Sequence, residues 1–324
     1  MSLGDHVRTL GRGPGRSRSL TQPEAAEAMT LMLSGSAAPE AVGALLMLLR
    51  MKGETAEEIA GFASAARAAM PVLPQPDLDW PCYAAGRTRG LPWFLLSARL
   101  VARAGYRVLL HGWNGSDAAI RDGLAPAGIA VTDTQGLKAT ERAAEGAEAM
   151  PGEQGIAYLP LEELSPPLYR LLRLRDVLGL RSCINTVCRV LNPGGAAASV
   201  QGVFHPSYRL LQADAGQLLG LPALTVIKGG GGEFERHPAK AVAAFGLRHG
   251  QPWEASFADL LPEETRRLDD GSTDPARLAA LWDGTLTDPF AEAVVLGTAA
   301  LALETLGEAD GLTRARALWA ARAD

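Results

Sequence analysis

The stretch from Leu168 to Pro193, LYRLLRLRDVLGLRSCINTVCRVLNP, says most about the fold. Its leucines recur at the three- and four-residue spacing that is typical of one apolar helical face (Leu171, Leu174, Leu178). Gly179 falls where a capping glycine would end that helix. The next segment, Ile184–Leu191, is apolar enough to be buried. The pattern predicts an arginine-bearing helix that leads into the core and holds guanidinium groups at the mouth of a cleft.

Positive charge is concentrated in this stretch and in two others. Residues 170–189 carry five arginines and one aspartate, a net charge of +4, whereas the whole chain of 324 residues carries −5. Residues 1–20 carry +3 and residues 87–107 carry +5, so the remainder holds −17. Net acidity by itself disfavours a nucleic-acid partner. Positive and negative charges are thus separated along the chain, which leaves two interpretations open. The arginines either form an anion-binding face or lie on a solvated surface of a chain that uses Arg far more than Lys (27 against 4).

Length and composition predict a globular protein of two domains or one large one. Hydrophobic residues make up 47% and charged residues 21% of the chain. No run approaches the roughly 20 apolar residues that span a bilayer, and the N-terminus lacks the apolar core of a signal peptide. The three cysteines are odd in number and not closely paired (Cys82, Cys183, Cys188). They predict buried thiols and a reducing, cytoplasmic setting rather than disulfides or a zinc site.

The first 70 residues predict a small helical bundle. Residues 5–19 are rich in Gly and Arg and predict a loop or mobile arm. Thr21 with Glu24, and Thr55 with Glu58, have capping-box spacing and predict helices to about Leu33 and Met70. Between them, Pro39–Met51 is apolar on nearly every side, which predicts a helix that is buried all round or packs on a partner chain.

Beyond this bundle, Pro71–Pro81 predicts a linker, and strands then alternate with helices. The predicted strands are Tyr106–His111, Ile156–Leu159, Ala198–Phe204 and Ala223–Lys228. The predicted helices are Leu95–Ala104, Ala118–Ala127, Ser207–Leu219 and residues 288–307. Such alternation predicts an α/β domain with a mostly parallel sheet flanked by helices. Residues 262–287 give no clear pattern.

Several residues of the opening stretch match a known signature. It resembles the Arg-x-x-Leu-Gly-x-Arg-Thr-x-Phe-Asn…Asn-Pro motif of anthranilate phosphoribosyltransferases and other members of glycosyltransferase family 3. The matching residues are Arg175, Leu178, Gly179, Arg181, Asn185, Asn192 and Pro193. The resemblance implies a helical domain of residues 1–76, with 161–181 packed on it, and an α/β glycosyltransferase-like domain of residues 77–160 and 182–324. It also implies a homodimer formed through the helical domain.

The motifs with which this family holds phosphoribosyl pyrophosphate are altered. Arg87 and Arg89 follow Gly86 where the family has a Gly-Thr-Gly-Gly-Asp loop, and Pro92–Leu95 replaces Asn-x-Ser-Thr. Of the Lys-His-Gly-Asn turn, His111 and Gly112 remain. No catalytic residue is predicted. The predicted anion- or phosphate-binding residues are Gly86, Arg87, Arg89, His111, Gly112, Arg175 and Arg181.

A magnesium site is also expected. Lys228–Arg236, KGGGGEFER, lies where the family has adjacent Asp-Glu, and Phe234 takes the Asp place. Glu233 and Glu235 could hold one magnesium ion if the segment is extended. The four glycines predict either an anion-binding nest of backbone amides or a flexible turn.

This combination resembles the YbiB-like, or TrpD-like, subgroup of the family. The subgroup shares the segment Leu10–Gly13, the Leu-Pro-Trp run Leu91–Trp93, the Leu-Leu-His-Gly turn and the run Lys228–Arg236. That resemblance implies loss of the transferase activity and binding of nucleic acid without sequence preference. The nucleic-acid-binding candidates are Arg87, Arg89, Arg99, Arg103, Arg170 and Arg173, with Trp93 and Trp113 as residues that could stack on bases. One alternative is an active glycosyl- or phosphoribosyltransferase that uses magnesium and an anionic acceptor. Another is a dimer without a ligand. A phosphorylated small molecule is thus the other predicted partner class.

Overall fold

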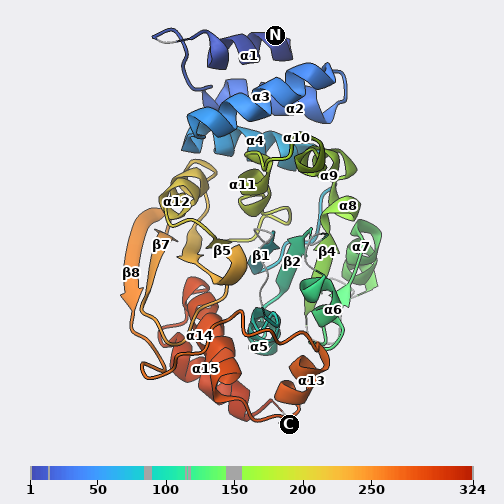
Figure 1. Cartoon of the computed structure of the whole chain (residues 1–324). Coiled ribbons are helices and arrows are strands. Elements are labelled where there is room, and N and C mark those ends of the chain that lie inside the picture. Colours follow the sequence, from blue (N-terminus) through green and yellow to red (C-terminus); the bar gives the residue numbers. More distant parts are fainter. Residues whose placement is uncertain are drawn as a thin grey trace.

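Four helices at the N-terminus form a bundle at one end of the molecule (Figure 1). The computed structural model describes residues 2–13, 15–83, 90–113, 115, 118–143 and 155–322. The four helices are α1 (Leu3–Gly11), α2 (Gln22–Leu33), α3 (Pro39–Lys52) and α4 (Ala56–Ala68). Both predicted capping boxes are present, with Thr21 and Thr55 as N-caps. The three helices predicted between Thr21 and Met70 are therefore confirmed.

The prediction of a loop or arm over residues 5–19 was wrong for its first half. Helix α1 covers Leu3–Gly11, and Ser2 caps it in a capping box with Asp5. Its apolar face is buried, and Gly11 lies against Leu48 of α3. The contact also explains why α3 can be apolar on nearly every side, because α1 covers one of its faces. Met51 at the end of α3 stays 81% exposed.

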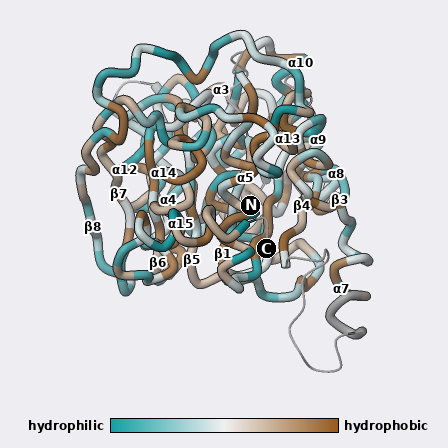
Figure 2. The backbone as a smooth tube through the Cα atoms, turned by 90° about the horizontal axis from the view of Figure 1, so that it is seen from below, coloured by the Kyte–Doolittle hydropathy of each residue, from teal (hydrophilic) through white to brown (hydrophobic). Residues whose placement is uncertain are grey.

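The rest of the described chain is built on one sheet of eight strands. The strand order is β3-β4-β2-β1-β5-β6-β7-β8, and all pairs are parallel except β6–β7 and β7–β8. The strands are β1 (Leu78–Cys82), β2 (Val108–Gly112), β3 (Ala130–Val131), β4 (Ile156–Pro160), β5 (Ala198–Val203), β6 (Ala223–Lys228), β7 (Val242–Arg248) and β8 (Gln251–Phe257). The mostly parallel sheet was predicted, whereas the antiparallel pair β7–β8 was not. Figure 2 shows β8 at the outer edge, where its alternate residues are exposed.

The predicted linker Pro71–Pro81 is wrong at its end, because β1 begins at Leu78 in the centre of the sheet. Proline lacks an amide hydrogen and is normally excluded from central strands. Here β1 pairs with β5 only at Leu78 and Asp79, so the ladder on that side has ended before Pro81. The strand can therefore accommodate Pro81 while it keeps its pairing with His111 of β2.

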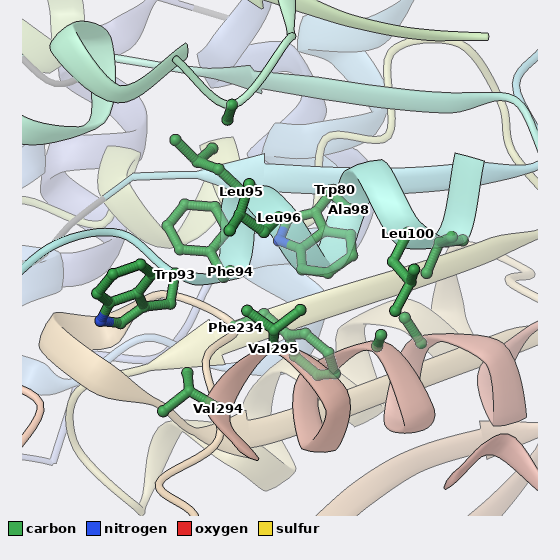
Figure 3. Packing of buried hydrophobic residues seen from close by; sticks show 14 of the residues in the cluster. Trp80, Trp93, Phe94, Leu95, Leu96, Ala98, Leu100, Phe234, Val294 and Val295 are labelled. Carbon is green, nitrogen blue, oxygen red and sulfur yellow. The ribbon is translucent and has the colours of Figure 1, made fainter. Parts of the chain in front are cut away.

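Helices cover both faces of the sheet. On one face lie α5 (Phe94–Arg103), α14 (Pro289–Thr305), α15 (Gly311–Ala320) and α13 (Ala276–Trp282), the last within the segment without a prediction. Figure 3 shows this core, in which Trp80 packs against Phe94 and Phe234. The other face packs on α11 (Ile184–Arg189), α12 (Tyr208–Leu218) and the bundle. Two short helices, α6 (Ala119–Leu124) and α7 (Thr134–Ala143), flank β3.

The opening stretch of the sequence joins the bundle to the sheet. It forms α9 (Pro166–Arg173), α10 (Arg175–Leu178) and α11, preceded by α8 (Leu161–Leu164). The single predicted helix is thus two, and Gly179 ends the second in the left-handed conformation (φ 68°), as predicted. Buried leucines of α8 and α9 share a core with α2 and α4, in keeping with the predicted packing of 161–181 on the bundle. The domain boundaries themselves stay a prediction. No described helix is long and apolar enough to cross a membrane.

Candidate functional site

The carboxyl ends of the parallel strands all lie at the edge of the sheet that faces the bundle (Figure 1). Ligands of open α/β sheets bind outside this edge, where loops that follow the strands meet. Trp113 directly follows β2, and α8 directly follows β4. The segments after β5 and β6 begin at the same edge. A ligand site is therefore expected at this edge, and the predicted site residues are located relative to it below.

Trp113, Tyr169, Arg173 and Arg175 form a cluster of aromatic rings and guanidinium groups at this edge, named here the Trp113 cluster. The centroids of the Trp113 and Tyr169 rings are 6.2 Å apart, at 61°. The guanidinium carbon of Arg173 lies 5.6 Å from the centroid of Trp113 and 5.8 Å from that of Tyr169. The guanidinium carbon of Arg175, the first residue of α10, lies 5.8 Å from the centroid of the Trp113 ring. Both rings are half-buried and Arg173 is exposed, so the cluster presents cations and aromatic edges to solvent.

The geometry of the Trp113 cluster is fixed by its neighbours. Arg173 donates hydrogen bonds to the Tyr169 hydroxyl (3.0 Å) and to Asp176 (2.6 Å). The hydrogen bond to Asp176, followed by that to Tyr169, raises the pKa of Arg173. A side chain at Gly115 would lie 2.7 Å from the Trp113 ring, so glycine is required there for the ring to occupy its place. The cluster is preorganised by contacts within the protein.

His111, a predicted anion ligand, lies in a buried network instead. Its side chain has no exposed surface. Nδ1 lies 2.9 Å from the Tyr83 hydroxyl and Nε2 lies 3.0 Å from Asp79. Asp79 in turn accepts a hydrogen bond of 2.7 Å from Ser199. Both ring nitrogens are therefore engaged, and the imidazole is not presented to the strand edge.

Gly112, also a predicted anion ligand, lies at a close approach of two strands. A side chain there would meet the Cys82 carbonyl oxygen at 2.1 Å. The packing of β1 against β2 therefore requires glycine at this position. The predicted buried thiols are confirmed, since Cys82, Cys183 and Cys188 are all buried and none of them forms a disulfide.

The glycine-rich segment after β6 is a turn whose amides are largely used within the protein. Gly229 and Gly230 donate backbone hydrogen bonds to Val203 and Glu235, and Gly232 and Glu233 donate to Gly229 and Gly230. The expectation of an anion-binding nest is therefore wrong, because a nest needs adjacent free amides. The segment presses on β5, where a side chain at Gly202 would lie 2.0 Å from the Glu233 backbone.

Glu233 and Glu235, the predicted metal ligands, are 0% and 1% exposed. Glu235 Oε1 accepts a hydrogen bond of 3.0 Å from the Phe94 amide at the start of α5. Phe234, in the place of the family's Asp, points into the core against Trp80. Glu233 acts electrostatically on Arg189, whose pKa is lowered by burial and raised by that carboxyl group. Among the described residues, no group of three His, Cys, Asp or Glu side chains is placed to hold a metal.

The other predicted arginines are scattered. Arg99 of α5 stacks on Trp282, 3.9 Å from its centroid, and Arg103 donates to the Ala321 carbonyl. Figure 1 places α5 at the end of the molecule opposite α9, so these two arginines are far from the Trp113 cluster. Arg170 is exposed on α9, and Trp93 is buried, 2% exposed. Gly86, Arg87 and Arg89 lie outside the described residues.

Arg181 lines a cavity between the bundle and the sheet, with an accessible volume of about 150 Å³. The cavity also contains Arg50 of α3, Arg189 of α11 and Gln212 of α12, none of which was predicted to be functional. Arg189 lies in the arginine-rich stretch, so charge could have indicated it. Arg50 and Gln212 could not be found from the sequence, because only the tertiary fold brings α3 and α12 together.

Comparison with known proteins agrees with this architecture. A model of the helical bundle domain of a glycosyl transferase family matches residues 5–70. The chain is 32% identical to the anthranilate phosphoribosyltransferase of Myxococcus xanthus, over 94% of this chain and 92% of that protein. It is 30% identical to that of Roseiflexus castenholzii, over 98% and 93% of the two chains.

Solved structures share the fold over the whole chain. The anthranilate phosphoribosyltransferase (TrpD) of Thermus thermophilus gives a TM-score of 0.80 at 23% identity, covering 100% of this chain and 96% of that chain. The enzyme of Saccharomyces cerevisiae, in complex with PRPP and Mg, gives 0.77 at 15% identity, covering 99% and 94%. The bundle and the sheet thus define the fold shared by a class of glycosyl transferases. Within that class, the chain belongs to the anthranilate phosphoribosyltransferase (TrpD-like) family.

Proposed function

We propose that this member of the family binds single-stranded nucleic acid, without base specificity, at the Trp113 cluster. The observation that carries the proposal is the packing of two aromatic rings with Arg173 and Arg175 at the strand edge. Bases of any sequence stack on aromatic rings, and guanidinium groups bind the phosphates between them. Arg170, exposed on the same helix, would extend the positive surface. This is also the activity that resemblance to the YbiB-like subgroup implies.

The surroundings of the family's donor site support binding over transfer. A magnesium ion that bridges a pyrophosphate needs carboxylates directed at the ligand. Glu235 is instead buried and bonded to a backbone amide, and Phe234 supplies no ligand at all. These residues do not fit a magnesium ion in that position, and we derive no step through one. The magnesium site predicted at Glu233 and Glu235 is therefore not part of this proposal.

The alternative is an active phosphoribosyltransferase. It is supported by the names of the relatives, which are anthranilate phosphoribosyltransferases over nearly the full length, and by the complex of the yeast enzyme with PRPP and Mg. In this alternative the arginines at the strand edge would bind a phosphorylated donor or an anionic acceptor. Calorimetry with phosphoribosyl pyrophosphate and magnesium would then show saturable binding.

The deciding experiment is a titration of labelled oligothymidylate, followed by fluorescence anisotropy at several salt concentrations. Trp113→Ala should weaken binding by about 1–3 kcal/mol, the usual free-energy contribution of one base stacked on an aromatic ring. Trp253→Ala is the matched control, because Trp253 is also half-buried and stacked by an arginine, Arg248, but lies on β8. The proposal fails if the two variants bind equally well, or if binding by the wild type does not weaken with salt.

A homodimer through the helical domain is a further part of the proposal. It rests on the family resemblance and on apolar side chains that stay exposed on α3, on α10 and just after α10. Met51 and Val177 are each 81% exposed, and Leu180 is 46% exposed. Light scattering on the wild type and on Val177→Glu would test it, since a charge in the interface should shift the mass toward one chain.

A further inference from the structure

The cavity beside Arg181 is lined by more positive than negative charge. Three arginines line it (Arg50, Arg181, Arg189) against one carboxyl group among the described lining residues, that of Glu54. With His205 neutral, these groups sum to a charge of +2. Glu54 accepts a hydrogen bond of 3.2 Å from the Tyr208 hydroxyl. Burial, and then Glu54, raises the pKa of Tyr208 to about 12, as expected beside a carboxylate.

Arg181 is the member of this set without a counter-charge. No described residue forms an ion pair with its guanidinium group, although the side chain is only half exposed. Burial, together with the guanidinium groups of Arg175, Arg189 and Arg50, lowers the pKa of Arg181 to about 10. A cation that is withdrawn from water beside other cations raises the free energy of the folded state unless an anion joins it.

Gln212 gives a second and independent indication of a ligand. Its side chain has no exposed surface, and neither the amide nitrogen nor the amide oxygen has a hydrogen-bond partner in the described structure. A buried amide that makes no hydrogen bond destabilises the folded protein. Such a group is expected where a bound molecule completes the bonding. Gln212 lines the same cavity as Arg181, from the opposite element, α12.

We propose that this cavity is a binding site for a phosphate monoester, with Arg181 and Gln212 as its principal ligands. Ser182, Asn185 and Thr186, on α11 or just before it, add further hydrogen-bond donors. Donors therefore come from three elements, α3, α11 and α12, which suits an anion with several oxygens. A volume of about 150 Å³ matches a benzene-sized molecule and is too small for a nucleotide. The site takes inorganic phosphate, a small phosphomonoester, or the terminal phosphate of a longer molecule.

The bound anion would join the helical bundle to the sheet and its flanking helices. Arg50 belongs to α3 of the bundle, and it also donates a hydrogen bond of 2.8 Å to the Arg181 carbonyl. Phe204 and His205 follow β5, and Gln212 lies on α12. Phosphate in the cavity would therefore be expected to stabilise the bundle against the sheet. This site is separate from the Trp113 cluster and does not require nucleic-acid binding there.

The test is calorimetry of the full chain with inorganic phosphate, compared with sodium chloride at equal ionic strength. Arg181→Gln should weaken phosphate binding about tenfold or more, because a charge-assisted hydrogen bond is lost. Arg316→Gln removes the same charge from an exposed position on α15 and should bind as the wild type does. Equal binding by Arg181→Gln and the wild type, or no phosphate binding beyond the chloride control, would overturn the proposal.

Gln212→Leu is the second variant, in case Arg181→Gln does not fold. It should weaken phosphate binding several-fold while the unliganded protein melts no lower than the wild type, because an unbonded buried amide has been removed. A lower melting temperature with unchanged phosphate affinity would show that the amide is structural and would count against the site. Displacement of phosphate by a 5′-phosphorylated but not a 5′-hydroxyl oligonucleotide would identify a strand end as the source. Displacement by neither would assign the site to small phosphomonoesters.

Discussion

The Phe94 amide donates a hydrogen bond of 3.0 Å to Glu235 Oε1, although the two residues are 141 positions apart in the chain. The bond joins the first turn of α5 to the segment that follows β6. A carboxyl group at a helix N-terminus satisfies an amide that has no partner within the helix and interacts favourably with the helix dipole. Glu235, which the sequence suggested as a metal ligand, thus caps a helix.

Glu235→Ala should therefore reduce stability. The loss leaves a buried amide without an acceptor, so we expect about 1–3 kcal/mol less free energy of unfolding. Urea denaturation followed by circular dichroism measures it. Glu235→Gln keeps an acceptor oxygen and should lose less. If Glu235→Ala were as stable as the wild type but no longer responded to magnesium, the metal interpretation would be preferred.

Glu58 should be one of the most sensitive positions of the bundle. Its fully buried carboxyl group accepts hydrogen bonds from the amides of Leu20 (2.8 Å) and Thr55 (2.9 Å) and from Lys52 Nζ (3.1 Å). Glu58→Ala removes all three hydrogen bonds together, and we expect a loss of about 3–5 kcal/mol in the free energy of unfolding. Glu57→Ala, on the exposed face of the same helix turn, is the control. Thermal melting of both variants would decide, and equal melting temperatures would contradict the expectation.

Acid should weaken the bundle through Glu24. The hydrogen bond from Arg18 lowers the pKa of Glu24 to about 2, from an ordinary value of 4.5. A carboxyl group with a lowered folded-state pKa contributes stability that is complete above the unfolded pKa. That contribution is lost as the pH falls from about 4.5 toward 2. In Glu24→Gln, the free energy of unfolding should fall less steeply over this range than in the wild type. Parallel curves for the two proteins would exclude Glu24 as a contributor.

Arg99 and Arg103 should matter for stability more than for nucleic-acid binding. Arg99 stacks on Trp282, and Arg103 bonds to the chain near Ala321, so both hold the C-terminal helices against α5. The double variant Arg99→Gln/Arg103→Gln should lose about 1–2 kcal/mol of stability, chiefly the cation–π contact. Its affinity for oligothymidylate should change less than that of Arg173→Gln. A greater loss of affinity than Arg173→Gln shows would restore these two arginines as nucleic-acid ligands.

Arg173→Gln should act on the salt dependence of binding. Each phosphate contact on a single strand contributes about −0.7 to the slope of log K against log salt. Loss of one guanidinium group should make that slope shallower by about this amount, at every oligonucleotide sequence tested. Anisotropy titrations at four or more salt concentrations give the slope. An unchanged slope would place Arg173 outside the contact surface.

Local signals in the sequence predicted most of the fold. The capping boxes at Thr21 and Thr55, and the alternation beyond residue 90, depend on neighbouring residues and correspond to observed elements. Helix α1 was missed because Gly and Arg near it suggest a loop, while burial against α3 stabilises it. The antiparallel pair β7–β8 was missed because its edge strand is half exposed and carries a proline.

The site was less predictable, since its contacts are made by tertiary structure. The arginine-rich stretch indicated Arg173, Arg175 and Arg181, but no local pattern separates these from Arg99, which stacks on Trp282. Equally, the sequence does not show that Glu235 faces a backbone amide or that Gln212 lies beside Arg181. Each of these depends on how elements far apart in the chain approach one another.

Gly112 and His111 match two positions of the Lys-His-Gly-Asn turn of the family that the sequence resembles. In this chain the first is fixed by the 2.1 Å that would separate a methyl group from the Cys82 carbonyl oxygen, and the second by Asp79 and Tyr83. Both would be needed by the sheet even if no substrate ever reached it. The architecture by itself accounts for both residues, so their presence in the sequence is a poor guide to what the protein does.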